Sequence, residues 1–366
     1  MSEVLNFFDT NPYLVLFISF AIGYLFMPVV IEVAKKHNFV VSPNKRTSHD
    51  GDIPNIGGIN IFVSFLLTVF FFSFSMFSEM QFAIMGLAII LIVGFIDDLI
   101  ELQVSWKLFG QFLSGFFLIV MGDMRFTTID VIFGTCELSL WVSYLVTFFI
   151  FILIVNALNL IDGIDGLASG LGIIYSLFFG FYFYATGSKD LSISAFAMVG
   201  SLAVFFFYNV FGKHRKIFMG DSGSLLLGYM MFLYVYSFCE YNANGTIPEK
   251  YKLSHAPVMA FTILLVPLFD VIRVAITRIK KRKSPFSADK NHIHHLLMGL
   301  GLGHKTVTSI LMGLTVIFML FALIARNLPS FVLLSIDLIF AISSTLFIWN
   351  KINKKKIEQH TENKAL

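Results

Sequence analysis

Residues 140–166 read LWVSYLVTFFIFILIVNALNLIDGIDG and carry the clearest evidence for the architecture of the chain. Residues 140–158 contain no charged side chain, and about 20 mostly apolar residues suffice for a helix to cross about 30 Å of hydrocarbon. Residues 156–166 then bring together Asn, Asp and Gly residues. The stretch predicts a membrane-spanning helix that places a row of polar groups at one membrane surface.

The rest of the chain is equally apolar. Of its 366 residues, 57% are hydrophobic and 13% are charged, whereas soluble domains carry about 25% charged residues. This composition excludes a soluble globular enzyme, a disordered chain and a small disulfide scaffold. We expect an all-α, polytopic integral membrane helix bundle with about 11 transmembrane helices. The expected spans are roughly residues 13–34, 58–77, 80–96, 107–122, 140–158, 167–186, 191–211, 222–240, 256–277, 305–325 and 329–350.

The basic residues orient the bundle. Twenty of the 26 Lys and Arg residues, Lys107 among them, lie in one alternating set of connections and in the C-terminal tail. The opposite connections hold five, and Lys/Arg-rich loops face the cytoplasm. With an odd number of spans, the N-terminus lies outside and the C-terminus inside. The net charge of +3 gives no broad basic surface, so no nucleic-acid partner is expected.

The N-terminal segment, residues 1–12, carries Glu3 and Asp9 and no basic residue, which is the reverse of a secretory signal. We therefore expect the first apolar run to be a retained span. No internal repeat or linker marks a second domain, so residues 1–350 are expected to form one membrane domain and residues 351–366 a basic cytoplasmic tail. Cys136 and Cys239 form no CxxC motif, and we expect two buried free thiols rather than a disulfide.

Four segments combine acids, amides, glycines or histidines at the ends of apolar runs, and the predicted topology puts all four on the cytoplasmic side. They are Gly-Phe-Ile-Asp-Asp (94–98), Asn-Ala-Leu-Asn-Leu-Ile-Asp-Gly-Ile-Asp-Gly (156–166), Phe-Met-Gly-Asp-Ser-Gly-Ser (218–224) and Asn-His-Ile-His-His (291–295).

Asp97 and Asp98 end the third predicted span. Taken alone, two acids at a helix end could simply be solvated. They would, however, face the negative end of the helix dipole beside the hydrocarbon, where ionisable groups are costly and usually functional. A bound cation or cationic ligand would offset both penalties.

The second segment repeats a polar residue every three positions, at Asn156, Asn159, Asp162 and Asp165. At this spacing the side chains fall on nearly one helix face. Ordinary capping of a polar helix end is the alternative. A row of acceptors on an otherwise apolar helix favours recognition of a polar ligand such as a nucleoside.

Asp221 precedes the eighth span and could be its N-cap. A carboxylate combined with substrate phosphate oxygens is also what Mg²⁺ prefers.

The last segment places His292, His294 and His295 in the most basic loop, close to Arg273. Binding of phosphate or pyrophosphate fits these residues better than zinc, because no Cys or carboxylate completes a compact site.

In their order along the chain, these motifs resemble the polyprenyl-phosphate N-acetylhexosamine-1-phosphate transferase family of glycosyltransferase group 4. The resemblance extends from about Arg46 to about His304. It includes Arg46-Thr-Ser-His49, Pro54 with Gly57-Gly58, Asp97-Asp98, Asn159-Leu-Ile-Asp-Gly-Ile-Asp165, Phe218-Met-Gly-Asp221-Ser-Gly, Asp270-Val-Ile-Arg273, and Ser284-Pro-Phe-Ser-Ala-Asp-Lys290 with His292-Ile-His-His295.

The resemblance implies an enzyme of the bacterial inner membrane with its active site on the cytoplasmic face. Such an enzyme moves a sugar-1-phosphate from a UDP-N-acetylhexosamine to undecaprenyl phosphate, releases UMP and initiates a cell-envelope polysaccharide. It implies Mg²⁺, for which Mn²⁺ can substitute. Homodimers occur in the family, and the sequence neither supports nor excludes one.

The resemblance also implies roles for individual residues. Asp97, Asp98 and Asp221 are the expected catalytic acids, and Asp221 and Asp162 the expected metal ligands. The expected substrate-binding residues are Arg46, His49, Asn156, Asn159, Asp162, Asp165, Arg273, His292, His294 and His295.

The donor follows from the histidine segment. Family members that act on UDP-N-acetylmuramoyl-pentapeptide typically carry three consecutive His residues there, whereas this chain reads His292-Ile293-His294-His295. The pattern resembles the branch that uses simple UDP-N-acetylhexosamines, so we expect UDP-N-acetylglucosamine as the donor, with another UDP-N-acetylated sugar as the alternative.

Two other classes of membrane protein are weaker alternatives. A secondary transporter would place its acids near the bilayer midplane. A CDP-alcohol phosphatidyltransferase would carry a compact Asp-rich signature that is absent from this sequence.

Overall fold

The computed structural model of the chain describes residues 11–41, 52–76, 80–131, 134–244, 247–253, 255–285 and 291–365. Most of these residues are helical. The long helices are α2 (Val15–Lys36), α3 (Gly57–Phe72), α5 (Gln81–Ile100), α6 (Val104–Gly115), α7 (Leu140–Ile161), α8 (Leu167–Thr186), α9 (Lys189–Phe211), α10 (Gly220–Ala243), α12 (Leu265–Lys280), α14 (His304–Ile324) and α15 (Ser330–Ala365). The shorter helices are η1 (Pro12–Leu14), η2 (Phe116–Met121), η3 (Glu249–Tyr251), α11 (Ala256–Ile263) and α13 (Ile293–Gly299).

The membrane-spanning character expected from the sequence is confirmed. Within the described residues, nine helices are long and apolar enough to cross a membrane, and the pair α11–α12 makes ten if it counts as one span. The remaining expected span corresponds to α3, an apolar helix of 16 residues. The expected span at residues 256–277 is not straight, because α11 and α12 meet at an angle of 82°. Helix α15 runs on through residues expected to form a separate tail.

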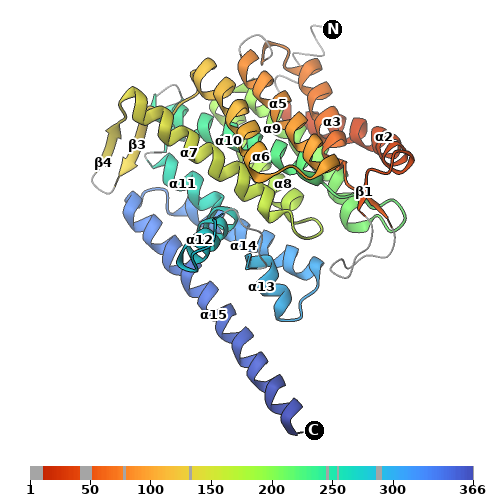
Figure 1. The fold of residues 1–366 in the computed structure, drawn as a ribbon. Coiled ribbons are helices and arrows are strands. Elements are labelled where there is room, and N and C mark those ends of the chain that lie inside the picture. The colour runs from red at the N-terminus through yellow and green to blue at the C-terminus, as the bar shows by residue number, and fades with distance from the viewer. Residues whose placement is uncertain are drawn as a thin grey trace.

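Two short antiparallel ribbons accompany the helices. Strands β1 (Val40–Val41) and β2 (Ile53–Pro54) pair Val40 with Pro54, and strands β3 (Thr128–Val131) and β4 (Gly134–Glu137) pair Thr128 with Glu137. Strand β1 and the β3–β4 hairpin lie at opposite ends of the bundle (Figure 1). They therefore mark its two ends.

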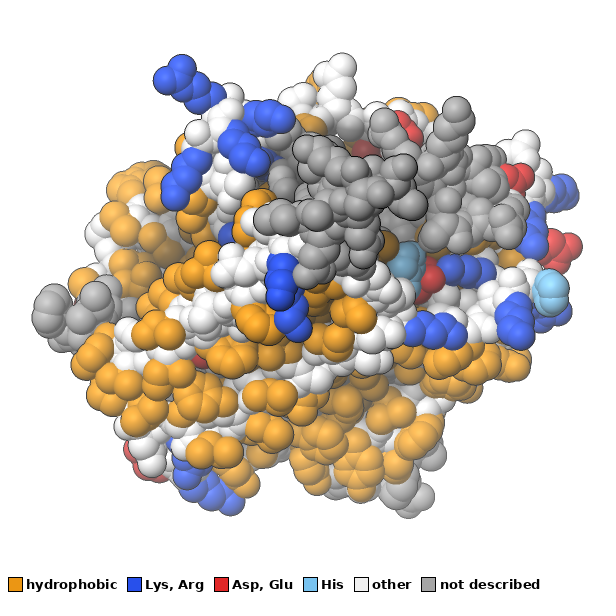
Figure 2. All heavy atoms as spheres, turned by 90° about the horizontal axis from the view of Figure 1, so that it is seen from below, with side chains coloured by type: hydrophobic (Ala, Val, Ile, Leu, Met, Phe, Trp, Pro, Cys, Tyr) orange, Lys and Arg blue, Asp and Glu red, His pale blue; other side chains and the backbone are white. Residues whose placement is uncertain are grey.

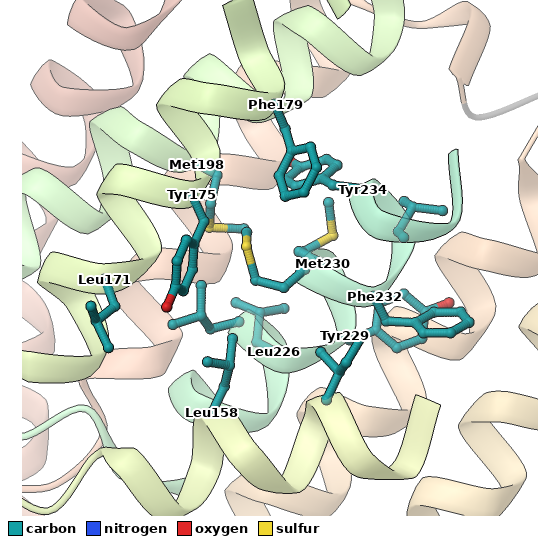
Figure 3. Packing of buried hydrophobic residues seen from close by; sticks show 14 of the residues in the cluster. Leu158, Leu171, Tyr175, Phe179, Met198, Leu226, Tyr229, Met230, Phe232 and Tyr234 are labelled. Atoms are coloured by element: carbon teal, nitrogen blue, oxygen red, sulfur yellow. The ribbon is translucent and has the colours of Figure 1, made fainter. Parts of the chain in front are cut away.

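Helix α10 forms the centre of the bundle and packs against α3, α5, α7, α8 and α11. Figure 3 shows its large side chains meeting Leu158 of α7, Tyr175 of α8 and Met198 of α9. The start of α10 touches neighbouring backbones directly, because a Cβ atom on Gly58 of α3 would lie 2.1 Å from the backbone nitrogen of Gly223. Glycine is required at this contact, which fixes the first turn of α10.

The outer helices turn large apolar side chains outward, such as Leu25, Trp141 and Ile324. Hydrophobic side chains cover much of the face seen in Figure 2. Such a surface suits contact with lipid rather than with water. The expectation of two buried thiols is wrong for one of them: Cys239 is buried, whereas Cys136 is exposed on β4, and both are free.

Candidate functional site

A polar cavity of about 540 Å³ opens where several helices end. All four polar segments of the sequence contribute to it, through the end of α5, the end of α7 with the turn that follows, the start of α10, and α13. The expected site residues that line it are Asp98, Asn159, Asp162, Asp165, Asp221 and His295. The fold thus brings together groups that are up to about 200 positions apart in the sequence.

Asp98 caps the first turn of α10. Its Oδ1 accepts the backbone N–H of Asp221 at 2.6 Å, and its Oδ2 accepts the backbone N–H of Ser222 at 3.0 Å. Gly220, with φ of 72°, makes the turn possible, since a Cβ atom there would meet Asp98 Oδ2 at 2.5 Å. Asp98 therefore satisfies free N–H groups of a helix start and holds Asp221 at the cavity.

Lys107 joins Asp97 to Asp221. Its Nζ lies 2.9 Å from Asp97 Oδ2 and 2.8 Å from Asp221 Oδ1. Lys107 is a site residue that the sequence motifs did not predict; in the sequence it indicated only the orientation of the chain. The signal was present, because this Lys lies in the first turn of an apolar helix directly after the Asp97–Asp98 pair.

The two asparagines of α7 have different surroundings. Asn159 donates through Nδ2 to Asp221 Oδ1 and, at 2.8 Å, to Ser224 Oγ. Asn156 does not line the cavity; its Nδ2 donates to Gln111 Oε1 of α6 at 2.7 Å. The structure therefore places Asn156 in a contact between α6 and α7 rather than with the other expected site residues.

Asp162 and Asp165 lie in the turn between α7 and α8. Loss of hydration raises the pKa of Asp162 well above its ordinary value, and the negative charges of Asp221, Asp98 and Asp165 raise it further. Burial would also raise the pKa of Asp165, but hydrogen bonds from His304 and Lys216 outweigh it and lower that pKa. Lys216 Nζ lies 2.7 Å from Asp165 Oδ2. Asp162 is therefore the carboxyl for which a bound cation would bring the larger electrostatic gain.

The histidines have three different positions. His295 lines the cavity, whereas His292 Nδ1 lies 2.8 Å from Asp270 Oδ2, away from the cavity lining. His294 is buried with no hydrogen-bond partner at either ring nitrogen. Its ring packs on Gly163, where a Cβ atom would lie 2.3 Å from Nε2. Burial, followed by the charge of His295, lowers the pKa of His294 to about 3, so its ring is neutral at pH 7.

Of the three remaining expected residues, the structure describes only Arg273. Arg273 Nη2 donates to Asp270 Oδ1 at 2.7 Å and to the Asn291 carbonyl at 2.5 Å, and Arg273 is not among the lining residues. Arg46 and His49 lie outside the residues that the structure describes. Their expected roles stay predictions.

The carboxylates can be tested for their fit to a magnesium ion. No group of three or more His, Cys, Asp or Glu side chains in the described part of the chain is arranged to hold a metal by itself. Mg²⁺ is usually held by one or two carboxylates and completed by substrate phosphates and water. Asp221 and Asp162 both line the cavity and provide hard oxygen donors. The donor set therefore fits Mg²⁺ shared with a phosphate substrate and does not fit a metal held by protein alone.

The sequence of this chain is similar to those of known bacterial proteins. A model described as glycosyl transferase family 4 matches residues 80–238. The chain is 32% identical over 281 residues to the undecaprenyl-phosphate alpha-N-acetylglucosaminyl 1-phosphate transferase of Escherichia coli (strain K12), covering 76% of this chain and 74% of that protein. It is 29% identical over 341 residues to the protein of that name from Yersinia pestis, covering 92% and 90%. It is 32% identical over 302 residues to a probable undecaprenyl-phosphate N-acetylglucosaminyl 1-phosphate transferase of Bacillus subtilis (strain 168), covering 82% and 81%.

Proposed function

Because this chain belongs to glycosyl transferase family 4, we propose that it transfers N-acetylglucosamine-1-phosphate from UDP-N-acetylglucosamine to undecaprenyl phosphate and releases UMP. The observation that carries the proposal is the cavity in which Asp98, Asn159 and Asp221 converge at the ends of apolar helices. A site at the ends of membrane-spanning helices can meet a lipid phosphate at the headgroup level and a soluble nucleotide from the aqueous side.

The reaction exchanges one phosphate linkage for another. An oxygen of the acceptor phosphate forms a bond to the phosphorus that carries the sugar, and the bridging oxygen leaves with its electron pair as part of UMP. A phosphate monoester has a second pKa of about 6, so the acceptor is mostly dianionic at pH 7 and needs little help from a general base. The protein therefore contributes mainly positioning and charge stabilisation.

Two lysines supply positive charge at or beside the cavity. Lys107 lies between Asp97 and Asp221, and Lys216 lines the cavity beside Asp165. Two phosphate substrates repel each other, so fixed cations near the point of attack lower the energy of the transition state. Asp97 and Asp98 are the acids that hold this arrangement, Asp97 by pairing with Lys107 and Asp98 by capping α10.

We assign Mg²⁺ to Asp221 and Asp162, with Mn²⁺ as a substitute. The support is the pair of carboxylates at the cavity and the raised pKa of Asp162 among negative neighbours. When bound, the ion supplies Lewis-acid neutralisation of phosphate charge. We assign His295 to the pyrophosphate or sugar of the donor, and the support is that it lines the same cavity.

The proposed location is the bacterial inner membrane, with the cavity on the cytoplasmic face, where the enzyme would initiate a cell-envelope polysaccharide. The excess of Lys and Arg in the connections on the cavity side supports this orientation. A secondary transporter is not favoured, because the acids lie at helix ends rather than near the middle of the bundle.

The proposal is tested by incubating membranes that contain the protein with radiolabelled UDP-N-acetylglucosamine and undecaprenyl phosphate. We expect labelled lipid product and an equal amount of UMP. Parallel reactions use UDP-N-acetylgalactosamine and UDP-N-acetylmuramoyl-pentapeptide as donors. Preference for the pentapeptide donor would refute the assigned branch, and preference for another small sugar would refute only the choice of epimer.

A further inference from the structure

We propose that Asp270 of α12 is a positioning residue for this transfer, which docks the histidine-bearing helix α13 and so holds His295 at the cavity. The inference rests on the proposed function, because it assigns a part of the donor site. Asp270 lies outside the cavity lining, and its hydrogen-bond partners among the described residues, Arg273, His292 and Ile293, do not line the cavity either. It would therefore act through α13 and not on the substrate.

The carboxylate of Asp270 is the centre of a buried hydrogen-bond cluster. Its Oδ1 accepts from Arg273 Nη2 at 2.7 Å and from the backbone N–H of Ile293 at 2.9 Å, and its Oδ2 accepts from His292 Nδ1 at 2.8 Å. Ile293 is the first residue of α13 and His292 directly precedes it. One carboxylate on α12 therefore binds both the backbone and the side chain at the start of α13.

The partners of His292 fix its protonation pattern. Arg278 Nη2 lies 3.4 Å from His292 Nε2, and a guanidinium can only donate, so Nε2 is the acceptor. The proton of the neutral ring is then on Nδ1, which donates to Asp270. Arg278 also donates through Nη1 to the carbonyl of Pro285 at 2.5 Å. Both ring nitrogens of His292 are used inside the protein, so His292 belongs to the docking cluster and not to the substrate-binding surface.

Helix α12 is suited to this role because its polar face points inward. Asp270 and Arg278 are buried, whereas Ile276 and Ile279 are exposed on the outside of the helix. In a membrane the exposed isoleucines would contact lipid. Helix α12 turns away from α11 by 82° and packs against α7 and α14, and the buried cluster connects it to α13.

The position of α13 decides where two histidines lie. His295 lines the cavity with Asp162 and Asp165, and His294 is buried against Gly163 in the same turn between α7 and α8. The nucleotide sugar reaches the cavity from water, whereas the acceptor tail stays in lipid. Displacement of α13 is therefore expected to weaken donor binding selectively.

The test compares steady-state kinetics of the purified wild type, Asp270→Asn, Asp270→Ala and Asp270→Glu. The matched control is Asp337→Asn, because Asp337 of α15 is also a fully buried carboxyl and hydrogen-bonds to Thr262, away from the cavity. We expect Asp270→Ala to raise the KM for UDP-N-acetylglucosamine at least tenfold and to change the KM for undecaprenyl phosphate less than twofold. Asp270→Glu should recover part of the donor affinity, and Asp337→Asn should keep both KM values.

A double-mutant cycle with His295→Gln identifies the route of the effect. If Asp270 acts through α13, the KM of the double variant for the donor should not exceed the larger of the two single-variant KM values. If the two residues act independently, the fold-increases in KM of the single variants should multiply in the double variant. Multiplying effects, or a fall in kcat with both KM values unchanged, would overturn the proposal. If Asp270→Ala does not fold, Asp270→Asn gives the same two readouts. An inactive wild type would instead refute the proposed function. The affinity for UDP, measured by calorimetry for the wild type, the Asp270 variants and Asp337→Asn, would then decide the proposal on Asp270.

Discussion

Asp98 on α5 accepts a 2.6 Å hydrogen bond from the backbone N–H of Asp221 on α10, across 123 positions of sequence. Through this contact, Asp98 holds the backbone of Asp221, the acid expected to bind the metal. A carboxylate is favourable at this place because the start of a helix carries free N–H groups and partial positive charge. Asp97 has a different partner, Lys107, and the adjacent acids therefore have separate tasks.

Replacing Asp221 by Asn should abolish turnover and leave the protein folded and inserted. The substitution removes one charged donor of the proposed Mg²⁺ site, and loss of such metal-based charge stabilisation costs several kcal/mol. The measurement is UMP release at saturating substrates, with thermal unfolding in detergent as the control for folding. Activity within threefold of the wild type would disprove the role of Asp221.

Lys107→Met should lower kcat by about 100-fold, because loss of a charge-assisted contact is worth about 3 kcal/mol in a partly buried site and each 1.4 kcal/mol is a factor of ten. The change leaves Asp97 and Asp221 facing each other without the cation that lies within 2.9 Å of both. Lys213→Met is the matched control, since Lys213 is exposed in the connection after α9. Equal activities of the two variants would show that Lys107 serves only to orient the chain in the membrane.

The spans could be predicted because lipid imposes a length and an apolar composition on each helix. The bend between α11 and α12 was missed, although its cause can be read from the sequence. Pro267 has no N–H to donate to the carbonyl of Ile263, and the helix is interrupted at Leu264 between them. The hydropathy of the segment does not reveal that Pro267 lacks a backbone N–H donor.

The site was predicted where one segment supplied its own pattern, as in Asn159, Asp162 and Asp165 with their three-residue spacing. Prediction failed where a distant partner decides the role. Asn156 belongs to the same spacing but hydrogen-bonds to Gln111, and Asp270 is recognisable as a hub only once His292 lies beside it. Such pairings between helices are set by packing and cannot be derived from a single sequence without the fold.

Of the groups that titrate, His294 should lower the stability of the protein as the pH falls from 7 to 5, whereas the raised pKa of Asp162 acts in the opposite direction. Burial lowers the pKa of His294 from 6.5 to about 3, so below pH 6.5 the unfolded chain binds a proton that the folded protein does not. The contribution of His294 to stability is therefore complete above pH 6.5 and decreases toward pH 3, by about 2 kcal/mol at pH 5. Thermal unfolding in detergent at several pH values measures this loss.

His294→Gln should flatten that pH dependence, because the amide does not titrate. His214→Gln is the control, since His214 is exposed in the connection after α9 and should keep the wild-type slope. If His294→Gln and the wild type lose stability equally between pH 7 and 5, the buried neutral state of His294 is wrong.

The orientation of the bundle can be tested with a cysteine that the chain already contains. Cys136 is exposed on β4, at the end of the bundle opposite β1, and Cys239 is buried. The predicted topology puts β4 outside, so a thiol reagent that cannot cross membranes should label Cys136 in intact cells. In a Cys136→Ser background, Lys283→Cys should be labelled only after permeabilisation, because Lys283 is exposed in the basic connection after α12. The reverse pattern would place the cavity on the outer face, where cytoplasmic UDP-sugars do not reach it, and would contradict the proposed reaction together with the topology.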